Sequence, residues 1–108
     1  MSSSKEYIDF VLEQCHGLSA RAMMGEYVLY YCGKVVGGVY DNRLLVKPTE
    51  AAVTLLPNAQ REFPYDGAKE MLLVENIEDR ELLKKLFELM YEELPEPKKK
   101  KSFDSVVV

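Results

Sequence analysis

The chain has 108 residues, of which 47% are hydrophobic and 30% are charged, so it suits one compact domain and leaves no room for a second. Its formal net charge of −4 excludes the broadly basic surface of a general nucleic-acid-binding protein. No apolar run approaches the roughly 18 residues that span a membrane, and the start MSSSKEYIDF lacks the basic and apolar regions of a secretory signal. We therefore expect a cytoplasmic domain without a membrane segment.

The first predicted element is a helix over residues 5–16. Ser3 and Glu6 have the spacing of a capping box at its start, and Gly17 is the residue type that commonly ends a helix in the left-handed conformation. The apolar positions recur at helical spacing, and they are Ile8, Val11, Leu12 and Cys15.

Cys15 and His16 are neighbours that suggest metal binding or nucleophilic catalysis. A metal site usually needs three or four ligands, and adjacent helical positions point about 100° apart. We therefore interpret both residues as structural, and we expect Cys15 and Cys32 to be reduced thiols.

Residues 21–48 alternate between apolar and polar positions as in an antiparallel sheet. Gly33 and the pair Asp41-Asn42 are residue types of tight hairpin turns, which predicts a meander of four strands. Gly37 and Gly38 interrupt the third strand, and they predict a bulge or a close approach, for which a packed helix of the same subunit is the preferred explanation.

The second predicted strand places large apolar groups on both faces, because its side chains alternate with period two. One face carries Tyr27, Leu29 and Tyr31, and the other carries Val28, Tyr30 and Cys32. We therefore expect both faces of the sheet to be covered.

The remainder of the chain predicts a short helix capped by Thr49, a loop over residues 58–69, a strand over residues 70–75 and a long helix over residues 78–94 with Asn76 as its cap. Apolar residues occupy about half the circumference of the long helix, which is wider than one contact surface requires. We expect this helix to lie between the sheet and either the first helix or a second subunit. The whole order is that of a two-layer α+β domain.

Three segments in this order carry a family resemblance: RAMMGEYVLYYCGKVVGGVYDNRLLVKPTEAAVTLLP, FPYDGAKEMLLVE and LPEPKKKK. Together they resemble the TfoX N-terminal domain family, whose pattern is a basic residue, a Met-containing Gly turn, Tyr-rich strands and a Lys-Pro before the short helix. The resemblance covers about residues 5–97. It implies a two-layer fold like that of the secretion-chaperone group and a regulatory role, because TfoX and Sxy proteins regulate bacterial competence for DNA uptake.

The better-known TfoX and Sxy proteins have a further C-terminal helical domain, so the resemblance implies only a stand-alone N-terminal module here. We expect this domain to comprise residues 1–97 and to be followed by a basic tail over residues 98–108.

Methionine and tyrosine side chains are the candidates for partner binding, because methionine adapts to varied surfaces and tyrosine is enriched at interfaces. The alternative is that they fill the sheet and its contact with a helix. The candidates are Met23, Met24, Tyr27, Tyr30, Tyr31 and Tyr40.

The lysine run at the start of the tail is the candidate for nucleic-acid contact, since such a run binds phosphates without reading sequence. It consists of Lys98, Lys99, Lys100 and Lys101. A solvated tail is the commoner explanation of such a run. The final residues, Val106 to Val108, could pair onto a sheet edge, but a frayed end is the preferred interpretation.

Catalysis is the least favoured interpretation. Carboxylates near predicted strand ends can serve as bases, but the sequence has no metal-ligand spacing, nucleophile elbow or dinucleotide fingerprint. These carboxylates are Glu26, Asp41, Asp66 and Glu70. We therefore predict a non-enzymatic regulatory or protein-interaction domain with no cofactor and no metal, acting on an unidentified protein partner or as a homodimer. The alternatives are a DNA-associated transcriptional regulator that uses the lysine tail and, more distantly, a small-molecule enzyme.

Overall fold

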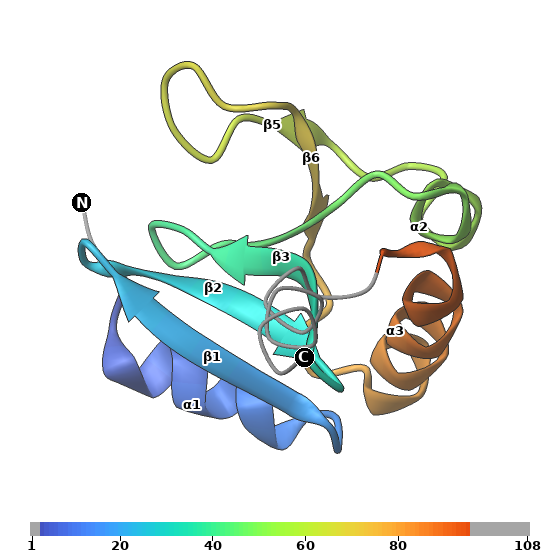
Figure 1. Ribbon diagram of the computed structural model, residues 1–108, viewed down its shortest axis with the longest axis horizontal. Coiled ribbons are helices and arrows are strands. Elements are labelled where there is room, and N and C mark those ends of the chain that lie inside the picture. Colours follow the sequence, from blue (N-terminus) through green and yellow to red (C-terminus); the bar gives the residue numbers. More distant parts are fainter. Residues whose placement is uncertain (1–2, 96–108) are drawn as a thin grey trace, which may run out of the picture.

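The computed structural model describes residues 3–95 of the chain (Figure 1). It confirms the predicted α+β class and the predicted order of a helix, a four-stranded meander, a short helix, a strand and a long helix. The elements are α1 (Lys5–Glu13), β1 (Leu18–Met23), β2 (Glu26–Tyr31), β3 (Lys34–Val39), β4 (Leu44–Val46), α2 (Glu50–Leu55), β5 (Arg61–Glu62), β6 (Met71–Val74) and α3 (Arg80–Glu93).

The strands form one antiparallel sheet of six in the order β1-β2-β3-β4-β6-β5. Three two-residue turns connect β1 to β4, and both residues of each turn have a positive φ angle, as type I′ hairpins require. The turns are Met24-Gly25, Cys32-Gly33 and Asp41-Asn42. The predicted turns at Gly33 and Asp41-Asn42 are thus confirmed.

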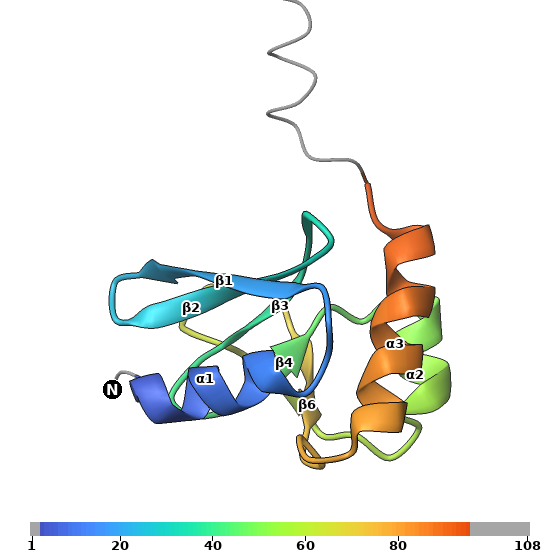
Figure 2. The same ribbon diagram turned by 90° about the horizontal axis from the view of Figure 1, so that it is seen from below.

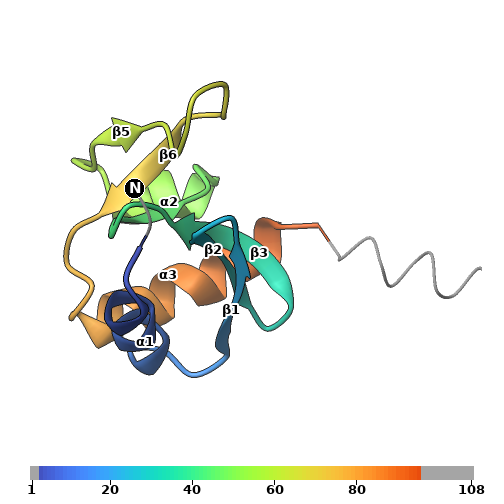
Figure 3. The same cartoon turned by 90° about the vertical axis from the view of Figure 1, so that its left-hand side faces the viewer.

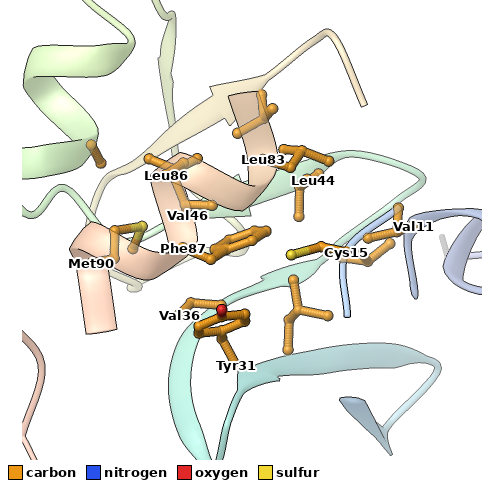
Figure 4. Packing of buried hydrophobic residues seen from close by; sticks show 14 of the residues in the cluster. Val11, Cys15, Tyr31, Val36, Leu44, Val46, Leu83, Leu86, Phe87 and Met90 are labelled. Atoms are coloured by element: carbon orange, nitrogen blue, oxygen red, sulfur yellow. The ribbon is translucent and has the colours of Figure 1, made fainter. Parts of the chain in front are cut away.

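Helices α1 and α3 pack on the same face of this sheet, as Figures 2 and 3 show. Ile8 and Val11 of α1 meet strand residues such as Leu29 in one apolar core. Phe87 of α3 stacks on Tyr31 with ring centroids 5.8 Å apart (Figure 4). The predicted alternation along β2 is correct, because its Tyr27, Leu29 and Tyr31 face contacts this core.

The prediction that both faces are covered is wrong for residues 3–95. The core contains residues of all three helices, and none of these helices lies over the opposite face of β1, β2 and β3 (Figure 2). That face holds the half-buried side chains of Val28, Tyr30 and Val35. An apolar sheet face therefore remains open in the described part of the chain.

Both long helices begin and end differently from the prediction. Ser4, not Ser3, caps α1 by accepting a hydrogen bond from the Tyr7 N–H, and the helix ends at Glu13, before the predicted His16. Asp79, not Asn76, caps α3 by accepting from the Leu82 N–H. Thr49 caps α2 as predicted.

Helix α2 packs against a second surface of α3, a contact that the sequence patterns do not predict. Glu93 near the end of α3 joins the two helices, because its carboxylate accepts hydrogen bonds from the backbone N–H groups of Glu50 and Ala51 at 2.8 and 2.9 Å. A negative charge at a helix start is stabilising, since four N–H groups there have no partner within the helix.

The glycines of β3 sit at a bulge, as predicted, but strand backbone and not a helix approaches them. The register between β2 and β3 shifts at Leu29/Tyr30. A Cβ atom on Gly37 would lie 2.0 Å from the backbone oxygen of Leu45, and one on Gly38 would lie 2.5 Å from the ring of Tyr40. Residues 58–69, predicted as a loop, also contain the short strand β5.

Candidate functional site

Three connections gather at one end of the sheet: the β1–β2 turn, the β3–β4 turn and the loop between β5 and β6 (left side of Figure 1). We call this surface the turn end and define it by Met23, Met24, Tyr40, Phe63 and Tyr65. Four of these side chains are largely exposed: Met23 by 51%, Met24 by 96%, Phe63 by 59% and Tyr65 by 63%. They make up four of the seven large hydrophobic residues exposed in residues 3–95.

The Glu26 carboxylate ties the two hairpin turns and the start of the chain together. It accepts hydrogen bonds from the Asp41 N–H at 3.0 Å and from the Ser3 N–H and hydroxyl at 3.1 and 2.7 Å. The Ser3 hydroxyl oxygen in turn accepts from the Asn42 N–H at 3.0 Å. Because hydrogen bonds to a charged group are the stronger ones, the turn end has a braced backbone beneath its exposed side chains.

Tyr40 and Tyr65 connect the β5–β6 loop to this scaffold, with ring centroids 6.1 Å apart. The Tyr40 ring lies over Gly38, where only a residue without a side chain leaves room for it. Burial raises the pKa of the Tyr40 hydroxyl, with a smaller contribution from Tyr65, so the group is neutral at physiological pH. An ion pair between Arg43 and Glu62 anchors β5 beside the same turn.

The structure distributes the six predicted partner-binding residues over three places. Met23, Met24 and Tyr40 lie at the turn end. Tyr30 lies half-buried on the open sheet face, while Tyr27 packs against the core and Tyr31 lies within it. The six residues therefore form no single site, and the turn end includes only three of them.

Phe63 and Tyr65 are site residues that the sequence patterns do not single out. They lie in a segment rich in turn residues, which has no strand or helix periodicity. Nothing in that segment indicates that the ring of Tyr65 contacts the ring of Tyr40, which lies 25 residues earlier in the chain. The available signal is compositional, since two aromatic residues in a polar loop have no strand or helix face to fill.

A groove of about 450 Å³ lies between the end of α1 and the start of α3. Buried Gln14 joins the two helices at its wall: its side-chain N–H donates to the Phe10 carbonyl at 2.9 Å, and its carbonyl oxygen accepts from the Arg80 Nε–H at 3.2 Å. The lining residues are Gln14, Cys15, His16, Tyr31, Arg80, Glu81, Lys84 and Glu88.

The groove contains the Cys15-His16 pair, but its thiol is a poor nucleophile. Burial raises the pKa of Cys15, and the negative charge of Glu88 acts in the same direction. Because the thiolate is the reactive form of cysteine, this thiol stays protonated near neutral pH. Both cysteines are free, with Cys15 buried and Cys32 exposed.

The carboxylates considered for catalysis do not meet in this groove. Glu26 and Asp41 lie at the turn end, where Glu26 is engaged with backbone N–H groups, and the groove is lined by Glu81 and Glu88 instead. No group of three or more His, Cys, Asp or Glu side chains that could hold a metal ion occurs in the described part of the chain.

The predicted nucleic-acid contacts Lys98, Lys99, Lys100 and Lys101, and the C-terminal valines, lie outside the described residues. Within residues 3–95, no helix has both the length and the apolar character needed to cross a lipid bilayer.

Comparison with known proteins gives a curated relative of closely similar length. It is the "Uncharacterized 12.7 kDa protein in trpE 5'region" of Spirochaeta aurantia, which is 36% identical over 106 residues. The match covers 94% of this chain and 92% of the relative. No family model matches the chain, and no solved structure matches it.

Proposed function

This chain belongs to the same family as the Spirochaeta aurantia protein, and we propose that it is a non-enzymatic, regulatory protein-interaction domain whose partner binds at the turn end. The observation that carries this proposal is the exposure of Met23, Met24, Phe63 and Tyr65 at one end of the sheet. Large exposed apolar patches on a folded domain mark interaction sites, and aromatic and methionine side chains are enriched in interface cores.

The rigid backbone beneath the patch supports the same proposal. Exposed side chains contribute most to binding when little conformational freedom is lost on association. Glu26 fixes the two hairpin turns, and Tyr40 holds Tyr65 from the loop. Met23 and Met24 add adaptable surface next to this fixed part.

We propose further that the domain is a module of the TfoX N-terminal type and acts in the cytoplasm. The basis is the order of the three resembling segments over about residues 5–97. The two free thiols are in keeping with a reducing compartment. The protonated thiol of Cys15 gives the groove between α1 and α3 no activated nucleophile, which favours binding over catalysis.

Site-specific photo-crosslinking in the native cell tests the proposal. A benzophenone amino acid is introduced in place of Met24, in place of Tyr65 or, as a control, in place of Lys85, which is exposed on α3. We expect the same discrete protein adduct from the first two positions and no such adduct from the third. Identical adduct patterns from all three positions would contradict a site at the turn end.

Affinity measurements with the crosslinked partner then give the size of the effect. Replacing Met24 and Phe63 together by serine should weaken binding at least about tenfold, because a few central residues dominate most interfaces. Both side chains are exposed, so the urea midpoint of the variant should match that of the parent chain, and an unchanged affinity would overturn the proposal.

A further inference from the structure

Strand β1 forms an edge of the sheet in the described part of the chain, since it pairs only with β2. It is six residues long and contains no proline. Natural proteins usually protect such an edge with a proline, a bulge, a very short strand or charged side chains, and the one charge of β1 is that of Arg21. The opposite edge, β5, is only two residues long. Strand β1 is therefore the edge best able to accept another strand.

The hairpin register determines which backbone groups of β1 face this edge. Met23 and Glu26 flank the two-residue turn, and the Cys32 N–H donates to the Gly17 carbonyl at 2.9 Å. Because the direction of backbone hydrogen bonding alternates along a strand, the odd-numbered residues of β1 bond to β2. The Leu18 N–H confirms the alternation, because it turns away from β2 and donates to Cys15 at 3.4 Å. The N–H groups of Ala20 and Ala22 thus point outward.

We propose that two copies of this chain pair through their β1 strands, antiparallel, about a twofold axis at Ala20. Ala20 of one copy then lies opposite Ala20 of the other, and Leu18 lies opposite Ala22. The outward N–H groups of Ala20 and Ala22 meet carbonyl groups of the second copy, and the two sheets become continuous. An isologous contact of this kind is the common way in which homodimers close.

The single charge of β1 selects this register. A twofold axis at Arg21 would place that side chain directly opposite its own copy, and like charges in opposite positions are destabilising. With the axis at Ala20, Arg21 lies opposite Ser19, which is itself opposite Tyr30 of β2 on the same face. The guanidinium can then extend over the half-exposed Tyr30 ring, a favourable arrangement of a cation and an aromatic face.

The side chains of β1 also suit a second copy better than an arbitrary peptide. On the face towards the helices, Leu18, Ala20 and Ala22 form an apolar row that alternates with Ser19 and Arg21, so self-pairing matches apolar positions with apolar positions. One strand pair buries less surface than most stable interfaces. We therefore expect an association that depends on protein concentration.

Sedimentation analysis of the full chain over a range of concentrations tests the pairing. Proline at position 20 removes an outward N–H that the pairing with β2 does not use, so Ala20→Pro should weaken dimerisation at least about tenfold without preventing folding. Ala20→Thr keeps the N–H group and should still dimerise. A chain that stays monomeric at every concentration, or an Ala20→Pro variant that is folded and equally dimeric, would overturn the proposal.

Disulfide formation tests the register in a chain whose own cysteines are replaced, as Cys15→Ala and Cys32→Ser. Ala20→Cys places two thiols opposite each other across the axis and should crosslink faster than Arg21→Cys, whose thiols are offset. Faster crosslinking of Arg21→Cys would overturn the register.

A truncation after Pro95 identifies the occupant of the edge. Loss of dimerisation on truncation would assign the contact to the C-terminal segment instead of β1 and would overturn the proposal, whereas retained dimerisation supports it. The photo-crosslinks at Met24 and Tyr65 test the proposed function separately, because they concern the turn end and do not depend on the Ala20→Pro result.

Discussion

Lys34 is buried, although lysine is rarely buried without a partner. Its ammonium group donates hydrogen bonds to the backbone oxygens of Tyr91 and Leu94 at 2.9 and 3.0 Å, and it lies 4.0 Å from the centre of the Tyr91 ring. These oxygens belong to the end of α3, where carbonyl groups lack partners within the helix and a positive charge is stabilising. One residue of a hairpin therefore fixes the end of the longest helix.

Replacing Lys34 by methionine should lower the free energy of unfolding by about 1–3 kcal/mol, because the two carbonyl groups lose a charged donor in a buried setting. Urea unfolding followed by circular dichroism measures this change. The matched control is Lys85→Met, an exposed position on α3, which should stay within about 0.5 kcal/mol of the parent. Equal effects of the two substitutions would show that the capping contact contributes nothing.

The pairing of β3 with β4 depends on a residue without a side chain, Gly37. Gly37 and the backbone of Leu45 are too close for any Cβ atom, at a point where β3 pairs with β4 and follows the register shift against β2. At the next residue, Gly38 leaves room for the ring of Tyr40, which contacts Tyr65 at the turn end.

Gly37→Ala should therefore cost about 3 kcal/mol or more, since strand backbone can relax less than the end of a side chain. Gly67→Ala is the comparison: Gly67 has a φ of +85°, and a Cβ atom added there would have no described atom within 4 Å, so only the left-handed conformation opposes alanine, at about 1–2 kcal/mol. Thermal unfolding of both variants measures the difference, and a Gly37→Ala variant as stable as Gly67→Ala would refute the close approach.

Local sequence patterns predict which helices and strands form better than they predict the residues at which these elements begin and end. Thr49 is identified correctly because it is the nearest capping residue before its helix. Ser3 and Ser4 are chemically equivalent, and the choice between them depends on Glu26 and Asn42, which lie far along the chain. For the same reason no local pattern could place Tyr65 beside Tyr40. Met23 and Met24 could be selected without such contacts, because the adaptability of methionine is a property of the residue type.

The charges of the whole chain are divided unequally between the domain and the tail. Residues 1–95 contain ten Lys and Arg and sixteen Asp and Glu, a formal charge of −6, whereas residues 96–108 contain four Lys and two acidic residues, a formal charge of +2. An acidic domain repels the phosphates that a lysine run attracts. The alternative of a DNA-associated regulator therefore depends entirely on Lys98 to Lys101.

Fluorescence anisotropy of a labelled generic duplex separates this alternative from the proposed protein-interaction role. We expect the full chain to bind weakly at low salt and to lose that binding at moderate salt, because phosphate contacts by a few lysines release few counterions. A chain truncated after Pro95 should not bind at either salt concentration. Binding by the truncated chain would place a nucleic-acid site on the domain itself, and tight binding by the full chain at moderate salt would favour the DNA-associated regulator over the protein-interaction domain.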